Sequence, residues 1–312
     1  MKISEAVIGK WPAILTQLGI DESFLNGKHG PCPSCGGKDR WRFDDKDGKG
    51  TYYCTNCGSG GGFKLLELVF GWPFPTAAKK VEEVIGNCSD YKPRPRNKPD
   101  PKIRLKKIAE KARPLSVHDE VFRYLKNRGI NESTFSAISN KVKVVNDGYW
   151  ENRQLVAKFD CMAALVTHKG KPLTYHLTYL ENGKKADVLS PRKILTPVQS
   201  ITGGAVELFE FTDELGVAEG IETALSAYQL FKVPVWAVLN TTGMKGFDIP
   251  EGVKKLWVFG DNDESSSFAG QGAAYELAHR AKVKGVSVEV KIPAQAGFDW
   301  NDELMTRIYE QH

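Results

Sequence analysis

The C-terminal third of the chain alternates short apolar segments with longer amphipathic ones. Four apolar segments have the length of buried β-strands: 215–219, 234–239, 255–260 and 286–292. Three further segments space their apolar residues as a helix does: 221–232, 268–284 and 301–310. Strands that are apolar throughout and alternate with helices predict a parallel sheet covered by helices on both faces.

The preceding residues show a less regular pattern. Apolar residues recur at helical spacing within 1–28 and at 63–70, 76–86 and 118–128. Alternation typical of strands follows at 153–160, 162–167 and 173–180. Residues 91–101 are rich in proline and basic residues and poor in apolar ones, which predicts a semi-extended linker and a domain boundary.

The positive charge of the chain is concentrated at this boundary. The net charge is +5, whereas residues 92–113 hold ten lysines or arginines against Asp100 and Glu110. Such a segment is either a solvated linker or a contact for a polyanion such as nucleic acid. The sequence has no long apolar run and no signal-peptide core, so we expect a soluble cytoplasmic protein without a membrane partner.

Four of the six cysteines form two Cys-x-x-Cys pairs. Cys32 and Cys35 are separated by eighteen residues from Cys54 and Cys57. This spacing predicts a tetrahedral zinc site, and four protein ligands leave no open position, so the zinc is expected to be structural. Segments 41–43 and 51–53 are predicted strands of the same small ribbon. The remaining cysteines, Cys88 and Cys161, are expected to be inert packing residues.

The ribbon also carries cations and aromatic residues between its cysteines. Arg40, Trp41, Arg42, Phe43 and Tyr52 would suit single-stranded DNA, because rings stack on bases while cations follow phosphates. A domain this small must bury some of its rings, so we expect about half of them to face solvent. Arg40, Trp41 and Arg42 are the residues that we predict to contact nucleic acid.

Acidic residues follow three of the predicted strands. Glu219 ends the first, Asp261 and Asp263 end the third, and Asp299 and Asp302 come after the fourth. Ligand sites of open α/β sheets lie beyond the carboxyl ends of the strands, so these carboxylates are expected at one edge. Carboxylates suit Mg²⁺ or Mn²⁺. A single Asp-x-Asp is more often a turn or a helix cap, but three clusters after three strands favour a metal site.

These motifs resemble a known family. Glu219-Gly220 with Asp261-x-Asp263 is similar to the TOPRIM fold of DnaG-type primases, topoisomerases and some nucleases. Segments 30–43 and 50–57 resemble the primase ribbons of satellite-phage alpha-type and plasmid replication proteins. Between them, 121–130 is similar to the Tyr-Leu-x-x-Arg-Gly-Ile element that opens primase polymerase domains. Further similarity to that group lies at 178–186, 191–193, 203–206 and 219–225.

The resemblance implies that the chain has four parts. They are a zinc-ribbon domain with flanking helices (1–90), a basic Pro-rich linker (91–113), an N-terminal subdomain of the primase core (114–210) and a TOPRIM catalytic domain (211–312). The fold class is therefore α+β and α/β, with a small β zinc ribbon before a Rossmann-like parallel sheet.

The resemblance also implies roles for residues. The divalent cations would be held by Glu219, Asp261, Asp263 and Asp299, and Arg192 and Lys193 would meet nucleotide phosphates or template. DnaG-type primases often carry Asp four residues after the first Glu. Here that position is Thr223, and Glu222 is a candidate substitute.

The implied function is a DNA primase that makes short RNA primers for phage, prophage or plasmid replication. Its partners would be single-stranded DNA, nucleoside triphosphates and a separate helicase, because no P-loop motif is present. Two alternatives remain. A TOPRIM nuclease would use the same acidic edge with water as nucleophile, and a non-catalytic single-strand binder would need no acidic cluster.

Overall fold

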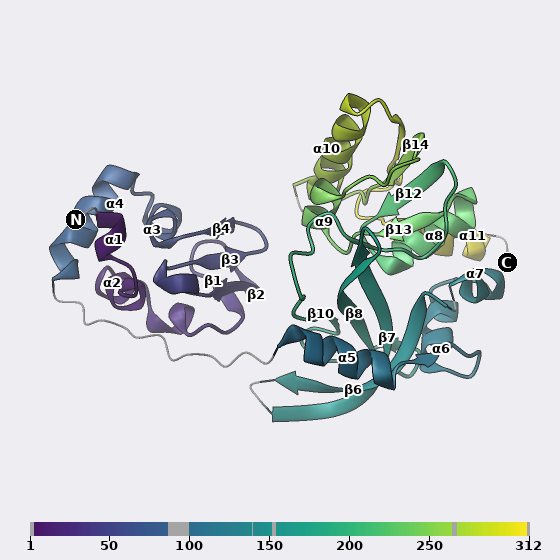
Figure 1. The fold of residues 1–312 in the computed structure, drawn as a ribbon, viewed down its shortest axis with the longest axis horizontal. Coiled ribbons are helices and arrows are strands. Elements are labelled where there is room, and N and C mark those ends of the chain that lie inside the picture. The colour runs from purple at the N-terminus through teal and green to yellow at the C-terminus, as the bar shows by residue number, and fades with distance from the viewer. Residues whose placement is uncertain (1–2, 87–99, 139, 152–153, 264–266, 311–312) are drawn as a thin grey trace. The chain divides into compact units, whose positions relative to one another are not determined.

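The computed structural model describes residues 3–86, 100–138, 140–151, 154–263 and 267–310 (Figure 1). The chain divides into two compact units, Met1–Lys98 and Pro99–His312. Among the described helices, none combines the length and apolar character that crossing a membrane requires. Cys88 and residues 91–99 of the predicted linker lie outside the described residues.

The first unit is a four-stranded antiparallel ribbon packed against short helices. Its strands β1 (Gly30–Cys32), β2 (Gly36–Phe43), β3 (Tyr52–Cys54) and β4 (Gly58–Gly60) pair in sequence order. The helices are α1 (Ile3–Ala6), α2 (Trp11–Gln17), α3 (Gly62–Phe70) and α4 (Phe74–Ile85), with 3₁₀ turns η1 (Glu22–Leu25) and η2 (Lys46–Gly48). Trp11 lies so close to Gly62 that a Cβ there would come within 2.1 Å of the ring. The helices therefore complete a core that the ribbon alone is too small to form.

The second unit is built on one continuous sheet of eleven strands. Its main path runs β10-β8-β7-β11-β13-β12-β14-β15. The first half is an antiparallel meander whose strands are β6 (Val142–Glu151), β7 (Gln154–His168), β8 (Lys171–Glu181) and β10 (Arg192–Ile194). Two further short strands, β5 (Arg113–Pro114) and β9 (Lys184–Lys185), extend it. The short strand β11 (Ala205–Val206) pairs antiparallel with both β7 and β13 and joins the two halves.

The second half of the sheet is parallel. Its strands are β12 (Glu214–Ala218), β13 (Val235–Ala237), β14 (Lys255–Phe259) and β15 (Ser287–Lys291). Helices α8 (Ile221–Phe231) and α11 (Trp300–Glu310) contribute to one apolar cluster, and α9 (Thr241–Gly246) and α10 (Ala269–Val283) to another. The predicted parallel sheet with helices on both faces is confirmed. The bounds of every strand and helix predicted there agree with the structure within two residues, and α9 was not predicted.

The antiparallel half differs from the expectation in two places. Strand β6 was not predicted, and the two strands expected at 153–160 and 162–167 are one strand, β7. The helix expected at 118–128 is α6 (Glu120–Asn127), and α7 (Glu132–Ala137) follows it. Both helices lie on one face of the sheet, with Phe122 and Phe135 in ring contact.

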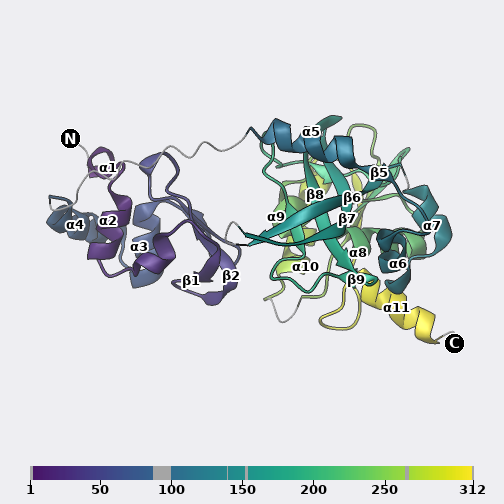
Figure 2. The same ribbon diagram turned by 90° about the horizontal axis from the view of Figure 1, so that it is seen from below.

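The prediction that the linker continues to residue 113 is wrong beyond residue 100. Residues Pro101–Lys111 form helix α5, which Asp100 caps by accepting a hydrogen bond from the Lys102 backbone N–H at 2.9 Å. Ile108 of α5 is fully buried with residues of β6, β7 and β8. The helix lies beside these strands in Figures 1 and 2. Because Leu105 and Ile108 lie three residues apart, they share the face that meets the sheet, and the lysines face solvent.

Candidate functional site

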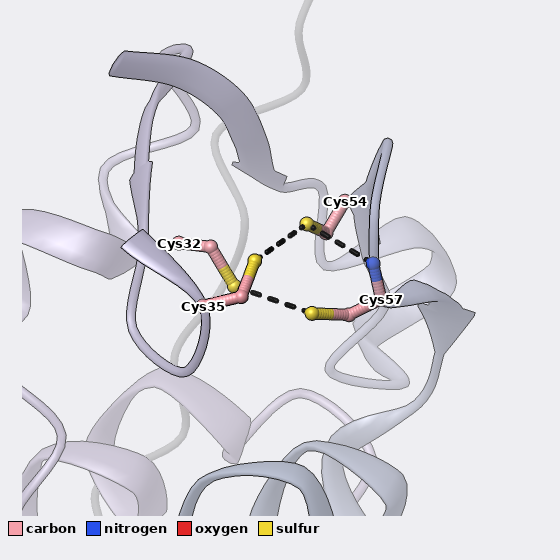
Figure 3. A group of neighbouring side chains, drawn as sticks. All are labelled: Cys32, Cys35, Cys54 and Cys57. Carbon is pink, nitrogen blue, oxygen red and sulfur yellow. Dashed lines mark hydrogen bonds between the residues drawn. The ribbon is translucent and has the colours of Figure 1, made fainter. Parts of the chain in front are cut away.

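The four ribbon cysteines converge on one point (Figure 3). Their sulfurs all lie within 4.8 Å of one another, with Cys32 4.0 Å from Cys57 and Cys35 3.7 Å from Cys54. A tetrahedral ion at about 2.3 Å from each sulfur requires sulfurs about 3.8 Å apart. Cys32, Cys35, Cys54 and Cys57 therefore fit a zinc ion, and they leave no fifth position for a reacting water.

The backbone conformation around the cysteines and the protonation of their sulfurs also suit a bound cation. The N–H of Ser34 approaches the Cys32 sulfur at 3.5 Å and that of Cys57 approaches the Cys54 sulfur at 3.4 Å. Gly36 and Gly58, which follow the two knuckles, have φ of 68° and 85°, a conformation that glycine adopts without strain. Burial and hydrogen bonds with neighbouring sulfurs raise the pKa of Cys57, so without a cation the four sulfurs cannot all be thiolates.

The prediction that these aromatic rings of the ribbon are exposed for stacking on bases is wrong. Trp41, Phe43 and Tyr52 are buried, with Trp41 only 1% exposed. The Trp41 indole N–H donates to the carbonyl of Phe24 at 2.8 Å, and its ring stacks on Tyr52 with centroids 5.0 Å apart. Trp41 therefore belongs to the core of the unit and is not available to a base.

The exposed face of the ribbon presents a different ring. Tyr53 is 42% exposed and is the direct cross-strand partner of Arg42, so both side chains lie on the same face. Arg40, two residues before Arg42, shares that face. Arg42 forms an ion pair with Asp44 at 2.7 Å. Of the residues predicted to bind nucleic acid, Arg40 and Arg42 are accessible, and Tyr53 is the ring that the sequence interpretation missed.

The acidic edge lies beyond the carboxyl ends of the neighbouring parallel strands β12 and β14. Glu219 follows β12, and Asp261 comes two residues after the end of β14. Glu219 Oε1 and Asp261 Oδ1 are buried without a hydrogen-bond partner. Two buried carboxylate oxygens without donors are costly unless a cation is present, so their chemistry fits a divalent ion.

Electrostatics at this edge support that interpretation. Burial, followed by repulsion from Asp263, raises the pKa of Glu219 to about 7. Burial, followed by repulsion from Glu219 and Asp299, raises the pKa of Asp261 to about 8. Carboxylates in this arrangement suit Mg²⁺, which keeps several water or phosphate ligands.

Asn262 explains why Asp261 and Asp263 can serve one site. Its amide donates to the carbonyl of Pro293 at 2.9 Å, and its side-chain oxygen accepts from Gln271 at 2.7 Å. Asn262 is thus held against the loop before α11. The close approach of Gly270 also confines Asp263, because a Cβ there would lie 3.0 Å from Asp263 Oδ2.

The acidic pair Asp299 and Asp302 also has a structural role. Asp299 Oδ1 accepts from the backbone N–H of Asn301 at 2.6 Å and of Asp302 at 3.0 Å. Asp302 Oδ2 accepts in return from the Asp299 N–H at 3.1 Å, which completes a reciprocal cap of α11. The pair is therefore a helix cap. Both carboxylates also act on the acidic edge, because repulsion from Asp299 and, to a smaller extent, from Asp302 raises the pKa of Asp261.

Glu222 is occupied by protein partners. Its carboxylate accepts a hydrogen bond from the Tyr124 phenol and lies 3.5 Å from the Lys185 amino group. Burial opposes the charge, but Lys185 and the Tyr124 hydrogen bond outweigh it and lower the pKa of Glu222 to about 2. These contacts do not favour Glu222 as the substitute metal ligand.

Arg192 and Lys193 lie on opposite faces of the sheet. Lys193 places its amino group 3.5 Å from the centroid of the Tyr149 ring. Arg192, by contrast, acts on the acidic edge, because its charge partly offsets the burial that raises the pKa of Glu219. Since adjacent residues of a strand point to opposite faces, only one of the two can serve this edge. Arg192 is that residue, and the expectation for Lys193 is not supported by its contacts.

Comparison with protein families gives three matches. Residues 214–308 match the Toprim domain, and residues 27–63 match the zinc-binding domain of primase-helicase. The chain joins a primase-type zinc ribbon to a Toprim domain. Residues 100–208 match a further family described as a domain of unknown function. Glu219, Asp261, Asp263 and Asp299 all fall within the Toprim domain, and the four cysteines fall within the zinc ribbon.

Solved primase structures align with this chain at low sequence identity. The zinc-binding and RNA polymerase domains of the Aquifex aeolicus primase align with 99% of this chain and 83% of their own, with 13% identity and a TM-score of 0.46. A DNA primase domain from Pseudomonas aeruginosa aligns with 68% of this chain and 77% of its own, with 13% identity and a TM-score of 0.44. The assignment of the Toprim domain and of the zinc ribbon rests on the family matches.

Proposed function

We propose that this chain is a DNA primase that synthesises short RNA primers on single-stranded DNA. The observation that carries the proposal is the pair of buried, donor-free carboxylates, Glu219 and Asp261, in a chain that also has a primase-type zinc ribbon. Such carboxylates fit a divalent cation. A metal site alone gives no reason to expect a nucleic acid template, whereas the primase-type zinc ribbon does.

The reaction would be attack of a ribonucleotide 3′-hydroxyl on a nucleoside triphosphate, with release of pyrophosphate. Mg²⁺ or Mn²⁺ held by Glu219, Asp261, Asp263 and Asp299 would supply charge neutralisation for the attacking oxygen and the leaving group. Arg192 is exposed beside Glu219, so it can bind a triphosphate at this edge. Asn262 holds the Asp261–Asp263 turn, and the Asp299 cap fixes the start of α11, so the carboxylates are positioned before substrate arrives.

The ribbon face of Arg40, Arg42 and Tyr53 would hold the template, with α5 as a second basic surface. We further propose that the chain serves a phage, prophage or plasmid in the cytoplasm of a bacterial host. A separate helicase would open the duplex. This context rests on the resemblance of the ribbon and the 219–225 motif to the primases of mobile elements.

The test is a primer-synthesis assay on short random-sequence single strands with labelled ribonucleotides and Mg²⁺ or Mn²⁺. Wild type should extend ribonucleotides into short products, and Asp261→Asn should lose at least a hundredfold in rate, a barrier increase of about 2.7 kcal/mol. Asp213→Asn is the matched control, because Asp213 is an exposed carboxylate before β12. Cleavage of the strand without ribonucleotide incorporation would instead indicate a Toprim nuclease. DNA binding without either reaction would indicate a non-catalytic binder.

A further inference from the structure

The tip of the β6–β7 hairpin exposes three large apolar side chains. Trp150 is 56% exposed, Val156 52% and Leu155 45%. Strand β8 pairs with β7 only from Asp160 onward, so the hairpin beyond that point extends past the end of β8 (Figures 1 and 2). A tryptophan on a projecting two-stranded ribbon has no core to stabilise, and its exposure therefore calls for a partner.

Trp150 and Leu155 form a continuous surface. They are direct cross-strand partners, and both lie over Gly148. A Cβ on Gly148 would come within 2.9 Å of Trp150 Nε1 and 2.8 Å of Leu155 Cδ1. Glycine thus leaves room for the indole beside the leucine. Lys158 is the cross-strand partner of Gly148, so its exposed side chain lies on the same face.

The surroundings of this surface are mainly cationic. Lys193 lies behind it, with its amino group 3.4 Å from the carbonyl of Trp150. Arg104 of α5 pairs with Asp147 of β6, which brings the N-terminal end of that basic helix to the hairpin. Two acidic residues, Asp147 and Glu151, also lie near this surface, and Asp147 is paired with Arg104. Exposed lysines continue along α5: Lys102, Lys106, Lys107 and Lys111.

We propose that the hairpin tip, formed by Trp150, Leu155 and Lys158, binds single-stranded DNA. A base would stack on the indole beside Leu155, and Lys158 would contact a neighbouring phosphate. An apolar protein segment or a second copy of this chain would satisfy the apolar side chains but not the lysines around them, whereas a single strand satisfies both. The inference rests on the proposed function, for which the hairpin would be a template contact separate from the acidic edge and the ribbon.

The experiment measures binding of fluorescein-labelled oligothymidylate to the full chain by anisotropy. Trp150→Ala should weaken binding about tenfold, whereas Trp150→Phe should retain most of the affinity, because a phenyl ring still stacks. The matched control is Tyr275→Ala, which removes a ring that is 60% exposed on α10. Lys158→Ala should lower the slope of log affinity against log salt by about 1, and Trp150→Ala should leave the slope unchanged.

Unchanged binding by Trp150→Ala would overturn the inference. So would sedimentation showing that wild type self-associates and that Trp150→Ala abolishes this while binding DNA normally, because the tip would then be a contact between copies. Primer synthesis is measured separately. If wild type binds oligothymidylate but makes no primer, the proposed function fails, and the effect of Trp150→Ala on binding still decides the hairpin. A wild type that binds no single strand would overturn both.

Discussion

The phenol of Tyr124, on α6, donates a hydrogen bond to the carboxylate of Glu222, on α8. The two residues are 98 positions apart, and the contact ties the region before the sheet meander to the Toprim domain. Lys185, on β9, completes the arrangement at 3.5 Å from the same carboxylate. Glu222 is thus a buried anion whose charge is balanced by protein groups.

The first prediction concerns this anion. Glu222→Gln should lower the free energy of unfolding by about 3 kcal/mol, because it leaves Lys185 without its buried partner. The Mg²⁺ concentration needed for half-maximal primer synthesis should not change. Glu219→Gln provides the comparison and should raise that concentration. A raised metal requirement in Glu222→Gln would instead place Glu222 among the ligands.

The second prediction concerns the repulsion at the acidic edge. Asp261→Asn should stabilise the metal-free protein by about 1 kcal/mol, since it removes a carboxylate whose pKa is raised to about 8 by burial and by neighbouring carboxylates. Wild type should gain about 2–3 kcal/mol from Mg²⁺ at a hundredfold excess over the Kd, and the variant should gain little. Chemical denaturation with and without Mg²⁺ measures both. The Asp213→Asn control should keep the wild-type gain.

The third prediction concerns acid stability through His176 on β8. Burial lowers the pKa of His176 to about 4, against an opposing effect of Glu222, with Arg192 and Lys185 lowering it further. The folded ring therefore stays neutral where the unfolded ring is already protonated, so stability is fully present above pH 6.5 and falls as the pH drops toward 4. Between pH 6.5 and 5, the free energy of unfolding of wild type should fall by about 2 kcal/mol more than that of His176→Gln.

Urea denaturation at a series of pH values measures this difference. His279→Gln, which changes an exposed histidine of α10, is the control and should follow wild type. Parallel curves for wild type and His176→Gln would show that His176 is protonated alike in the folded and unfolded chain.

The fourth prediction concerns the metal of the ribbon. The purified chain should contain one zinc ion, and Cys54→Ser should lose it, because three thiolates remain where four sulfurs lie within 4.8 Å. Chelation should expose the amides of 30–60 to hydrogen exchange and leave those of 205–300 protected. Cys161→Ala, which removes a buried cysteine of β7, should retain the zinc. A metal-free chain with an unchanged exchange pattern would contradict a structural role.

The fifth prediction separates the two rings of the ribbon. Trp41→Ala should destabilise the first unit by about 3–5 kcal/mol, because it removes a buried indole from the core. Tyr53→Ala should change stability by less than about 0.5 kcal/mol and should weaken single-strand binding by about 1 kcal/mol, the lower range for a stacked base. Thermal unfolding and anisotropy on the same samples distinguish these effects. Equal DNA affinity for Tyr53→Ala and wild type would remove Tyr53 from the template surface.

Much of the metal chemistry could be predicted from local spacing. Paired Cys-x-x-Cys motifs fix where sulfurs can meet, and an acidic residue at the end of an apolar strand has its position set by the strand direction. The predicted placement of Glu219 and Asp261 at one edge follows from β12 and β14 being parallel neighbours. Alternation along β10 could also have separated Arg192 from Lys193, but which face meets the acidic edge depends on the pairing of β10 with β8.

The sequence by itself determined the zinc ribbon, the parallel sheet and the edge that carries the carboxylates, because each depends on short-range periodicity or on strand direction. Tertiary structure alone decided which aromatic rings are free. Trp41 is buried because helices remote in sequence complete a small core around it. Trp150 is exposed because β7 extends beyond the end of β8. Tertiary structure also decided that the charge of Glu222 is balanced by Tyr124 and Lys185, since those partners come from distant segments of the chain.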